Sequence, residues 1–110
     1  SMSFNNLPLI VYDSFQSARP STMAMTPNGT TLYVALDATG AVAIFSRGVT
    51  GDLTFRAQKN LNLNSHQAPD SLCLCLSPQS KNLYVSSEQD NSISVFFFFS
   101  KGELTLLEKI

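Results

Sequence analysis

The chain has 110 residues, of which 44% are hydrophobic and 14% charged, and its formal net charge is −1. This length fits one domain at most, and the excess of apolar over charged residues excludes an intrinsically disordered chain. The scattered Lys and Arg residues form no basic stripe, and no apolar run is long enough to cross a membrane. We therefore expect neither a nucleic acid nor a membrane as a partner.

The chain reads as a succession of short strands with turn residues between them. Residues 7–12 are rich in β-branched and aromatic side chains and predict a first strand, which Pro8 places at a sheet edge or a strand start. Four more strands follow, and Pro27 with the Asn28-Gly29 pair forms the first turn between them. These strands are predicted at residues 22–26, 31–35, 41–46 and 53–58.

A polar connector then leads to a second set of strands. These are predicted at residues 72–77, 82–86, 92–97 and 103–108. Because no stretch of ten or more residues has helical periodicity, we expect an all-β fold. The chain divides into an N-terminal strand and linker (1–21), a first unit (22–59), the connector (60–71) and a second unit (72–110).

A step of 51 residues relates the two units without a gap. It carries Leu32-Tyr33-Val34 onto Leu83-Tyr84-Val85, and Gly51-Asp52-Leu53-Thr54 onto Gly102-Glu103-Leu104-Thr105. Units of four short strands with a period near 50 residues are typical of β-propeller blades. The predicted fold is therefore two four-stranded antiparallel propeller blades, preceded by the extra N-terminal strand.

The motifs also resemble a known family. In each unit a Thr-Pro or Ser-Pro pair, a Leu-Tyr-Val triplet, an aliphatic run ending in Phe45 or Phe96, and a Gly-x-Leu-Thr motif follow one another. This order resembles the blade of YVTN and lactonase-like (6-phosphogluconolactonase-type) propellers, over residues 22–110. The resemblance implies the propeller fold. These positions build the blade, so they do not indicate an activity.

Two blades are too few for a closed ring, which needs about four to eight. Either several copies of the chain associate head to tail, or the chain is an excerpt of a longer propeller. We favour association, in which the strand at residues 7–12 could exchange with or cover a neighbouring subunit. The expected partners are further copies of the chain or the remaining blades, and a protein bound at the loops.

Cys73 and Cys75 lie two residues apart in an apolar strand. Strand geometry directs both to the same face and disfavours a disulfide between them, so we expect two buried free thiols. His66, the one histidine of the chain, supplies too few further ligands for a metal site, and no cofactor is expected. Two free thiols are typical of a reducing compartment, which predicts a cytoplasmic protein.

The second unit ends its third strand in a run of four phenylalanines, three of which have no counterpart in the first unit. One interpretation is an overlong strand that buries its rings between blades. The other is a contact with a subunit or a partner, because adjacent exposed aromatic rings are uncommon without a reason. The candidates for such a contact are Phe97, Phe98 and Phe99.

In a propeller, the turns between second and third strands share one face with the connectors between blades, and ligands usually bind there. The candidate ligand-face residues are Arg19, Asp37, His66, Asp70, Glu88, Asp90 and Asn91. His66 is a weak candidate for a general base, against the simpler interpretation of a solvated loop histidine. Asp37 and Asp70 are typical turn formers. No phosphate-binding loop, nucleophile elbow or paired-carboxylate pattern is present.

Three functions remain open. We favour a non-enzymatic binding or interaction scaffold. The resemblance also allows a lactonase-like enzyme, either a sugar-lactone hydrolase or a related cycloisomerase. Such enzymes gather basic and acidic catalytic groups from several blades, and no residue here can be matched to them. The third is a lectin-like oligomeric propeller, although the chain lacks the tryptophan that usually supports a sugar ring.

Overall fold

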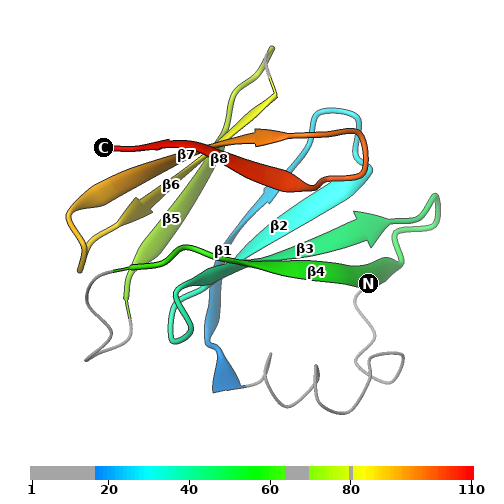
Figure 1. Cartoon of the computed structure of the whole chain (residues 1–110). Coiled ribbons are helices and arrows are strands. Elements are labelled where there is room, and N and C mark those ends of the chain that lie inside the picture. The colour runs from blue at the N-terminus through cyan, green and yellow to red at the C-terminus, as the bar shows by residue number, and fades with distance from the viewer. Residues whose placement is uncertain (1–16, 64–69, 80) are drawn as a thin grey trace.

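The computed structural model of the chain describes residues 17–63, 70–79 and 81–110, so the predicted strand at 7–12 and His66 lie outside the described residues. The strands are β1 (Pro20–Met25), β2 (Thr31–Leu36), β3 (Ala41–Arg47), β4 (Leu53–Asn60), β5 (Leu72–Leu76), β6 (Asn82–Ser87), β7 (Ser92–Phe98) and β8 (Leu104–Lys109). They form two four-stranded antiparallel sheets, ordered β1-β2-β3-β4 and β5-β6-β7-β8 (Figure 1). The prediction of an all-β chain with two blade-like sheets is confirmed.

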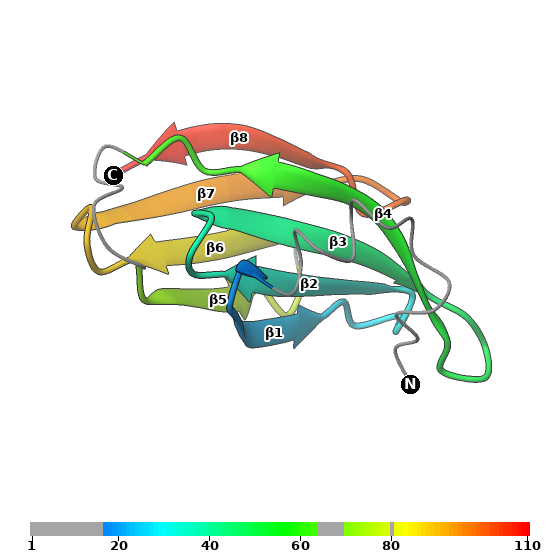
Figure 2. The same ribbon diagram turned by 90° about the horizontal axis from the view of Figure 1, so that it is seen from below.

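The first sheet, blade 1, packs face to face against the second, blade 2. Figure 2 shows the inner strands β1 and β5 along one edge of the pair and the outer strands β4 and β8 along the opposite edge. We call the face of blade 1 that contacts blade 2 its front face. The front face of blade 2 points in the same direction, away from blade 1, and the opposite face of each blade is its rear face. The front face of blade 1 and the rear face of blade 2 enclose an apolar core of Tyr33, Ala35, Val42, Ile44, Leu61, Leu63, Leu72, Leu74, Leu83, Val85, Phe96, Phe98 and Leu104.

A second apolar cluster covers the rear face of blade 1. It contains Ala18, Val34, Leu36, Ala41, Ala43 and Phe45, with Leu32, Leu53 and Phe55 packed against it. The rings of Phe45 and Phe55 meet edge to face, with centroids 5.6 Å apart. Because β3 is covered on both faces, it is apolar from Ala41 to Phe45 without alternation.

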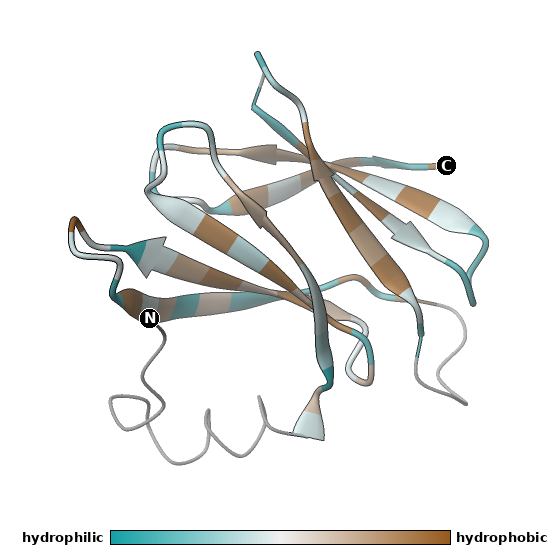
Figure 3. Ribbon diagram, turned by 180° about the vertical axis from the view of Figure 1, so that it is seen from behind, coloured by the Kyte–Doolittle hydropathy of each residue, from teal (hydrophilic) through white to brown (hydrophobic). Residues whose placement is uncertain are grey.

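Blade 2 shows the alternation that blade 1 lacks. On β5, Leu72 and Leu74 point into the core between the blades, whereas Cys73 and Cys75 point the other way and are exposed. Figure 3 shows β5 in brown along its length, because cysteine is itself apolar, so the alternation on this strand is one of burial and not of hydropathy. The prediction of two buried thiols is therefore wrong, because the strand buries one face only.

One polar contact between the blades stands out. The buried Tyr33 hydroxyl on β2 donates a hydrogen bond to the carbonyl oxygen of Gly102, in the β7–β8 hairpin, at 2.8 Å. Burial raises the pKa of Tyr33 well above its ordinary value of 10.0. Gly102 has a φ of +85°, and a Cβ added there would lie 2.6 Å from Thr31 Cγ2. Only glycine allows this close approach of the hairpin to β2.

Candidate functional site

The predicted ligand face is formed by the β2–β3 turn, the β6–β7 turn and the β4–β5 connector. Asp37 accepts hydrogen bonds at Oδ1 from Ser21 Oγ (2.7 Å) and from the Leu72 amide (3.2 Å). Its carbonyl oxygen accepts a hydrogen bond from the Asp70 amide (3.0 Å). Asp37 therefore ties the beginning of β1 in blade 1 to the beginning of β5 in blade 2.

Asp70 is a second tie at the same end, with 7% of its surface exposed. Its carboxylate accepts hydrogen bonds from the amides of Ser71 (2.7 Å) and Gln89 (2.9 Å) and from the Ser87 hydroxyl. These bonds hold the end of the connector against the β6–β7 turn. Neither carboxylate accepts the amide two residues further on, as an Asx turn would require, so both aspartates link segments that are distant in the sequence.

The β6–β7 turn carries three more of the predicted site residues. Asp90 forms a salt bridge with Lys109 (2.7 Å) and accepts a hydrogen bond from Ser92 Oγ (2.8 Å). Glu88 and Asn91 are exposed beside it, and Asn91 has a positive φ of 50°. The turn thus places one paired and one exposed carboxylate at the solvent boundary.

Arg19 lies just before β1, with a φ of 60°, and its carbonyl oxygen accepts a hydrogen bond from the Asp37 amide (3.1 Å). The structure therefore brings Arg19, Asp37 and Asp70 together near the inner strands, and it places Glu88, Asp90 and Asn91 in one turn. Among the described residues, no three His, Cys, Asp or Glu side chains are placed to hold a metal ion. No described helix is long and apolar enough to cross a membrane.

A hollow of about 650 Å³ lies at the opposite end of the strands, between blade 1 and the β7–β8 hairpin. We call it the basic hollow, because three cationic side chains line it together with a single carboxylate and several hydroxyls. The residues that matter below are Arg47, Arg56, Lys101, Glu103, Thr30 and Ser46.

Two of these cations are held in place by neighbouring groups. Arg56 donates a hydrogen bond from Nε to Ser46 Oγ, and Arg47 donates one from Nη1 to the Gly29 carbonyl oxygen at 3.4 Å. The one ion pair between described residues lies at the other end of the strands, so no described carboxylate comes within 4.0 Å of Arg47, Arg56 or Lys101. Within residues 17–63, 70–79 and 81–110, the three charges are therefore not neutralised by a carboxylate at close range.

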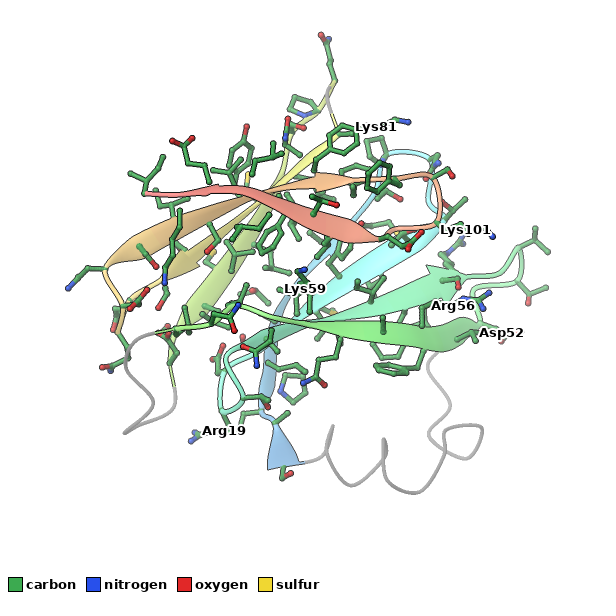
Figure 4. All side chains as sticks on the ribbon, in the orientation of Figure 1. Arg19, Asp52, Arg56, Lys59, Lys81 and Lys101 are labelled. Carbon is green, nitrogen blue, oxygen red and sulfur yellow. The ribbon has the colours of Figure 1, made fainter. Side chains whose placement is uncertain are left out.

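A smaller hollow of about 350 Å³ adjoins the basic hollow and adds Lys81 to the same end. Figure 4 shows Lys81, Lys101 and Arg56 at this end of the molecule and Arg19 at the opposite one. Charge is thus divided along the strands. The end with the hollows carries Arg47, Arg56, Lys81 and Lys101 against Asp52 and Glu103, whereas the other end carries Asp37, Asp70, Glu88, Asp90 and Glu108 against Arg19, Lys59 and Lys109.

The basic hollow was not among the sites predicted from the sequence. Lys101 is far along the chain from Arg47 and Arg56, and none of the three belongs to a motif. The cavity exists only because the two blades stack. One signal could have found it. Arg47 and Lys101 both flank hairpins between third and fourth strands, which the repeat places at the same end of neighbouring blades.

The phenylalanine run is divided between the two faces of β7. Phe98 is buried in the core between the blades, where its ring centroid lies 6.0 Å from that of Tyr33. Phe97 points to the opposite face, and its ring meets that of Phe99 edge to face at 5.0 Å. Phe99 is 48% exposed. Burial between blades thus accounts for Phe98, and a contact through the Phe97–Phe99 pair stays a prediction.

No protein-family model and no curated protein matches the chain. Solved structures with a similar fold include a periplasmic gluconolactonase from Pseudomonas aeruginosa (TM-score 0.75, 23% identity) and a candidate 6-phosphogluconolactonase from Bacteroides uniformis (TM-score 0.70, 25% identity). A protein from Lactobacillus plantarum has a TM-score of 0.70 at 23% identity. The matches cover 84%, 82% and 83% of this chain but 26%, 26% and 27% of those chains, respectively.

The chain therefore spans about a quarter of the length of these similar structures. The likeness to a periplasmic protein overturns the prediction of a cytoplasmic location. That prediction rested on two unpaired thiols, and strand geometry leaves Cys73 and Cys75 unpaired with each other in any compartment. The described part of the chain has the fold of two blades of a lactonase-like β-propeller.

Proposed function

We propose that the chain is a non-enzymatic binding segment of a propeller, and that its basic hollow holds a small anionic ligand. The observation that carries this proposal is the group of three cations, Arg47, Arg56 and Lys101, around a hollow in which no described carboxylate pairs with them. A concave site in which one sign of charge predominates concentrates ligands of the opposite sign, and here three cations outnumber the single carboxylate of Glu103.

The lining suggests the class of ligand. A guanidinium binds carboxylate or phosphate with two parallel hydrogen bonds, and the hydroxyls of Thr30 and Ser46 offer partners for sugar hydroxyls. We therefore propose a sugar acid or a phosphorylated sugar as the ligand. The names of two similar structures, a gluconolactonase and a candidate 6-phosphogluconolactonase, are compatible with this choice, because hydrolysis of a sugar lactone yields a sugar acid.

Calorimetric titration with gluconate and with inorganic phosphate tests the proposal. Arg56→Gln and Lys101→Gln should each weaken binding about tenfold, since a charge-assisted hydrogen bond contributes about 1.5 kcal/mol or more. Arg19→Gln removes a charge at the opposite end and serves as the matched control. Binding that is absent at millimolar ligand, or equally weakened in all three variants, would contradict the proposal.

Lactone hydrolysis is the second candidate, favoured by the names of the same two structures. A sugar-lactone panel assayed at neutral pH tests it, with His66→Ala as the variant expected to lose the activity. The absence of turnover on the panel would exclude this candidate. Gluconate binding distinguishes the two candidates. If Arg56→Gln weakens this binding and His66→Ala does not, the ligand binds in the basic hollow.

A further inference from the structure

The front face of blade 2 is exposed, although the equivalent face of blade 1 is buried. The 51-residue step carries the front face of blade 1 onto exposed or half-buried positions of blade 2. Ala24, Tyr33, Ala35, Val42 and Ile44 correspond in that order to Cys75, Tyr84, Ser86, Ile93 and Val95. We call the latter set the open face. Its residues are neighbours in the sheet, because Cys75 pairs with Tyr84, Tyr84 with Val95, and Ser86 with Ile93.

Burial differs sharply between the two sets. Tyr33 and Val42 are fully buried against blade 2, whereas Tyr84 is 37% exposed and Ile93 is 44% exposed. The hydroxyl of Tyr33 has the Gly102 carbonyl oxygen as its acceptor across the blade interface. Tyr84 stands at the equivalent position, on the side of blade 2 that faces away from blade 1.

The open face nevertheless keeps the size pattern of a packed interface. Small residues stay small, since Cys75 and Ser86 replace Ala24 and Ala35, and the tyrosine is retained. Val42 and Ile44 become Ile93 and Val95, a swap that keeps both shape and total volume. Substitutions that conserve volume are the ones a packed surface tolerates best, and a solvated strand face needs no such constraint.

We propose that the open face docks a further four-stranded blade of the same repeat, the next one around the ring. In this interface Tyr84 donates a hydrogen bond to a carbonyl oxygen in the hairpin between the third and fourth strands of that blade, as Tyr33 does to Gly102. The similar structures leave room for such a blade, being about four times as long as the segment they share with this chain. A second copy of the chain fits less well, because the rear face of its blade 1, with Val34 and Phe45, is already buried.

An extended chain tests this proposal. It consists of residues 1–110 followed by a second copy of residues 60–110, which is one repeat long. In the appended copy, serine replaces the counterparts of Cys73 and Cys75, and threonine replaces the counterpart of Ile93. The terminal blade then has a more polar outer face, as the end units of repeat proteins require.

Two readouts report docking. Alkylation of Cys73 and Cys75 by iodoacetamide should slow roughly threefold in the extended chain, because their repeat counterparts in blade 1, Thr22 and Ala24, are half-buried beside blade 2. Tyr84→Phe should lower the urea midpoint of the extended chain as much as Tyr33→Phe lowers that of the 110-residue chain. In the 110-residue chain itself, Tyr84→Phe should leave the midpoint unchanged.

The proposal is overturned if the thiols react equally fast in both chains, or if Tyr84→Phe is neutral in both. Failure of the appended blade to fold also counts against it, since the same residues fold on the equivalent face of blade 1. If sedimentation of the 110-residue chain shows a dimer in which both thiols are protected, the occupant is a second copy instead of a further blade. None of these measurements involves gluconate or phosphate binding, so their outcome neither supports nor contradicts the proposed function.

Discussion

At the scale of single residues, the Tyr33 hydrogen bond makes stability depend on pH in the alkaline range. Tyr33→Phe removes the donor to the Gly102 carbonyl oxygen and should cost about 1–2 kcal/mol near neutral pH. Above about pH 10 the unfolded chain loses the phenolic proton while the native chain, with its raised pKa, keeps it. The free energy of unfolding of the wild type should therefore fall by about 1.4 kcal/mol per pH unit more steeply than that of the variant.

Urea unfolding at a series of pH values measures this difference. The difference in the free energy of unfolding between the wild type and Tyr33→Phe should vanish within about one pH unit above the ordinary pKa of tyrosine. Tyr84→Phe is the matched control, because it occupies the same repeat position and leaves Tyr33 in place. Parallel curves for the wild type and Tyr33→Phe up to high pH would show that Tyr33 is not buried as described.

Gly102 gives a second prediction at this scale. Gly102→Ala should destabilise the chain by about 1–3 kcal/mol more than Gly51→Ala does. Gly102 has a φ of 85° and Gly51 a φ of 94°, so alanine strains the backbone at both positions. Only in Gly102→Ala does the new methyl group lie 2.6 Å from Thr31 Cγ2 in the other blade. Thermal unfolding measures the difference, and Thr31→Ser should rescue part of the loss in Gly102→Ala by removing that methyl group.

At the scale of elements, alternation and turn residues predicted all eight described strands, and the errors lie at their ends. The strand predicted from residue 22 begins at Pro20, because Pro20 pairs with Leu36 beyond a bulge in β1. The strand predicted to end at residue 58 continues to Asn60, which pairs with Ala41. A strand end is set by its partner in the ladder, and local sequence does not show how far that partner extends.

The candidate sites were less accessible to sequence reasoning. The end of the strands that carries Asp37 and Asp70 was predicted from topology. The chain alone does not reveal that the Asp37 carboxylate binds a backbone amide of the other blade, or that the Asp70 carboxylate binds the amide of Gln89 in the β6–β7 turn. The basic hollow was missed because it depends on how two sheets stack. Cys73 and Cys75 were misplaced for a related reason, since an apolar run does not tell whether one face of the strand or both are covered.

Asp70 carries the prediction that belongs to this scale. Asp70→Ala should cost about 2–3 kcal/mol, because the buried Ser87 hydroxyl and the Gln89 amide lose their acceptor. Glu88→Ala, at an exposed position of the same turn, should change stability by less than about 0.5 kcal/mol. Urea unfolding compares the two variants. Equal effects would mean that the turn is not held by the Asp70 carboxylate.

At the scale of the whole molecule, the apolar core between the sheets makes the two blades depend on each other. Residues from both blades enclose this larger core, and the smaller rear cluster of blade 1 lies outside it. An isolated propeller unit cannot bury its apolar face alone, so unfolding should be a single cooperative transition. The basic and acidic side chains are separated along the length of the strands, and each blade carries some of both. This separation therefore produces no charge repulsion between the blades.

Leu83→Ala tests that dependence. Leu83 lies on β6 of blade 2, is fully buried and faces blade 1, so truncation should cost about 2–5 kcal/mol through the cavity it leaves. If the blades unfold together, amide hydrogen exchange should accelerate on β3 of blade 1 as much as on β7 of blade 2. Leu107→Ala, at a 58% exposed position of β8, should leave both strands protected. Faster exchange confined to blade 2 would show that blade 1 is stable without it, and that the shared core does not couple the two sheets.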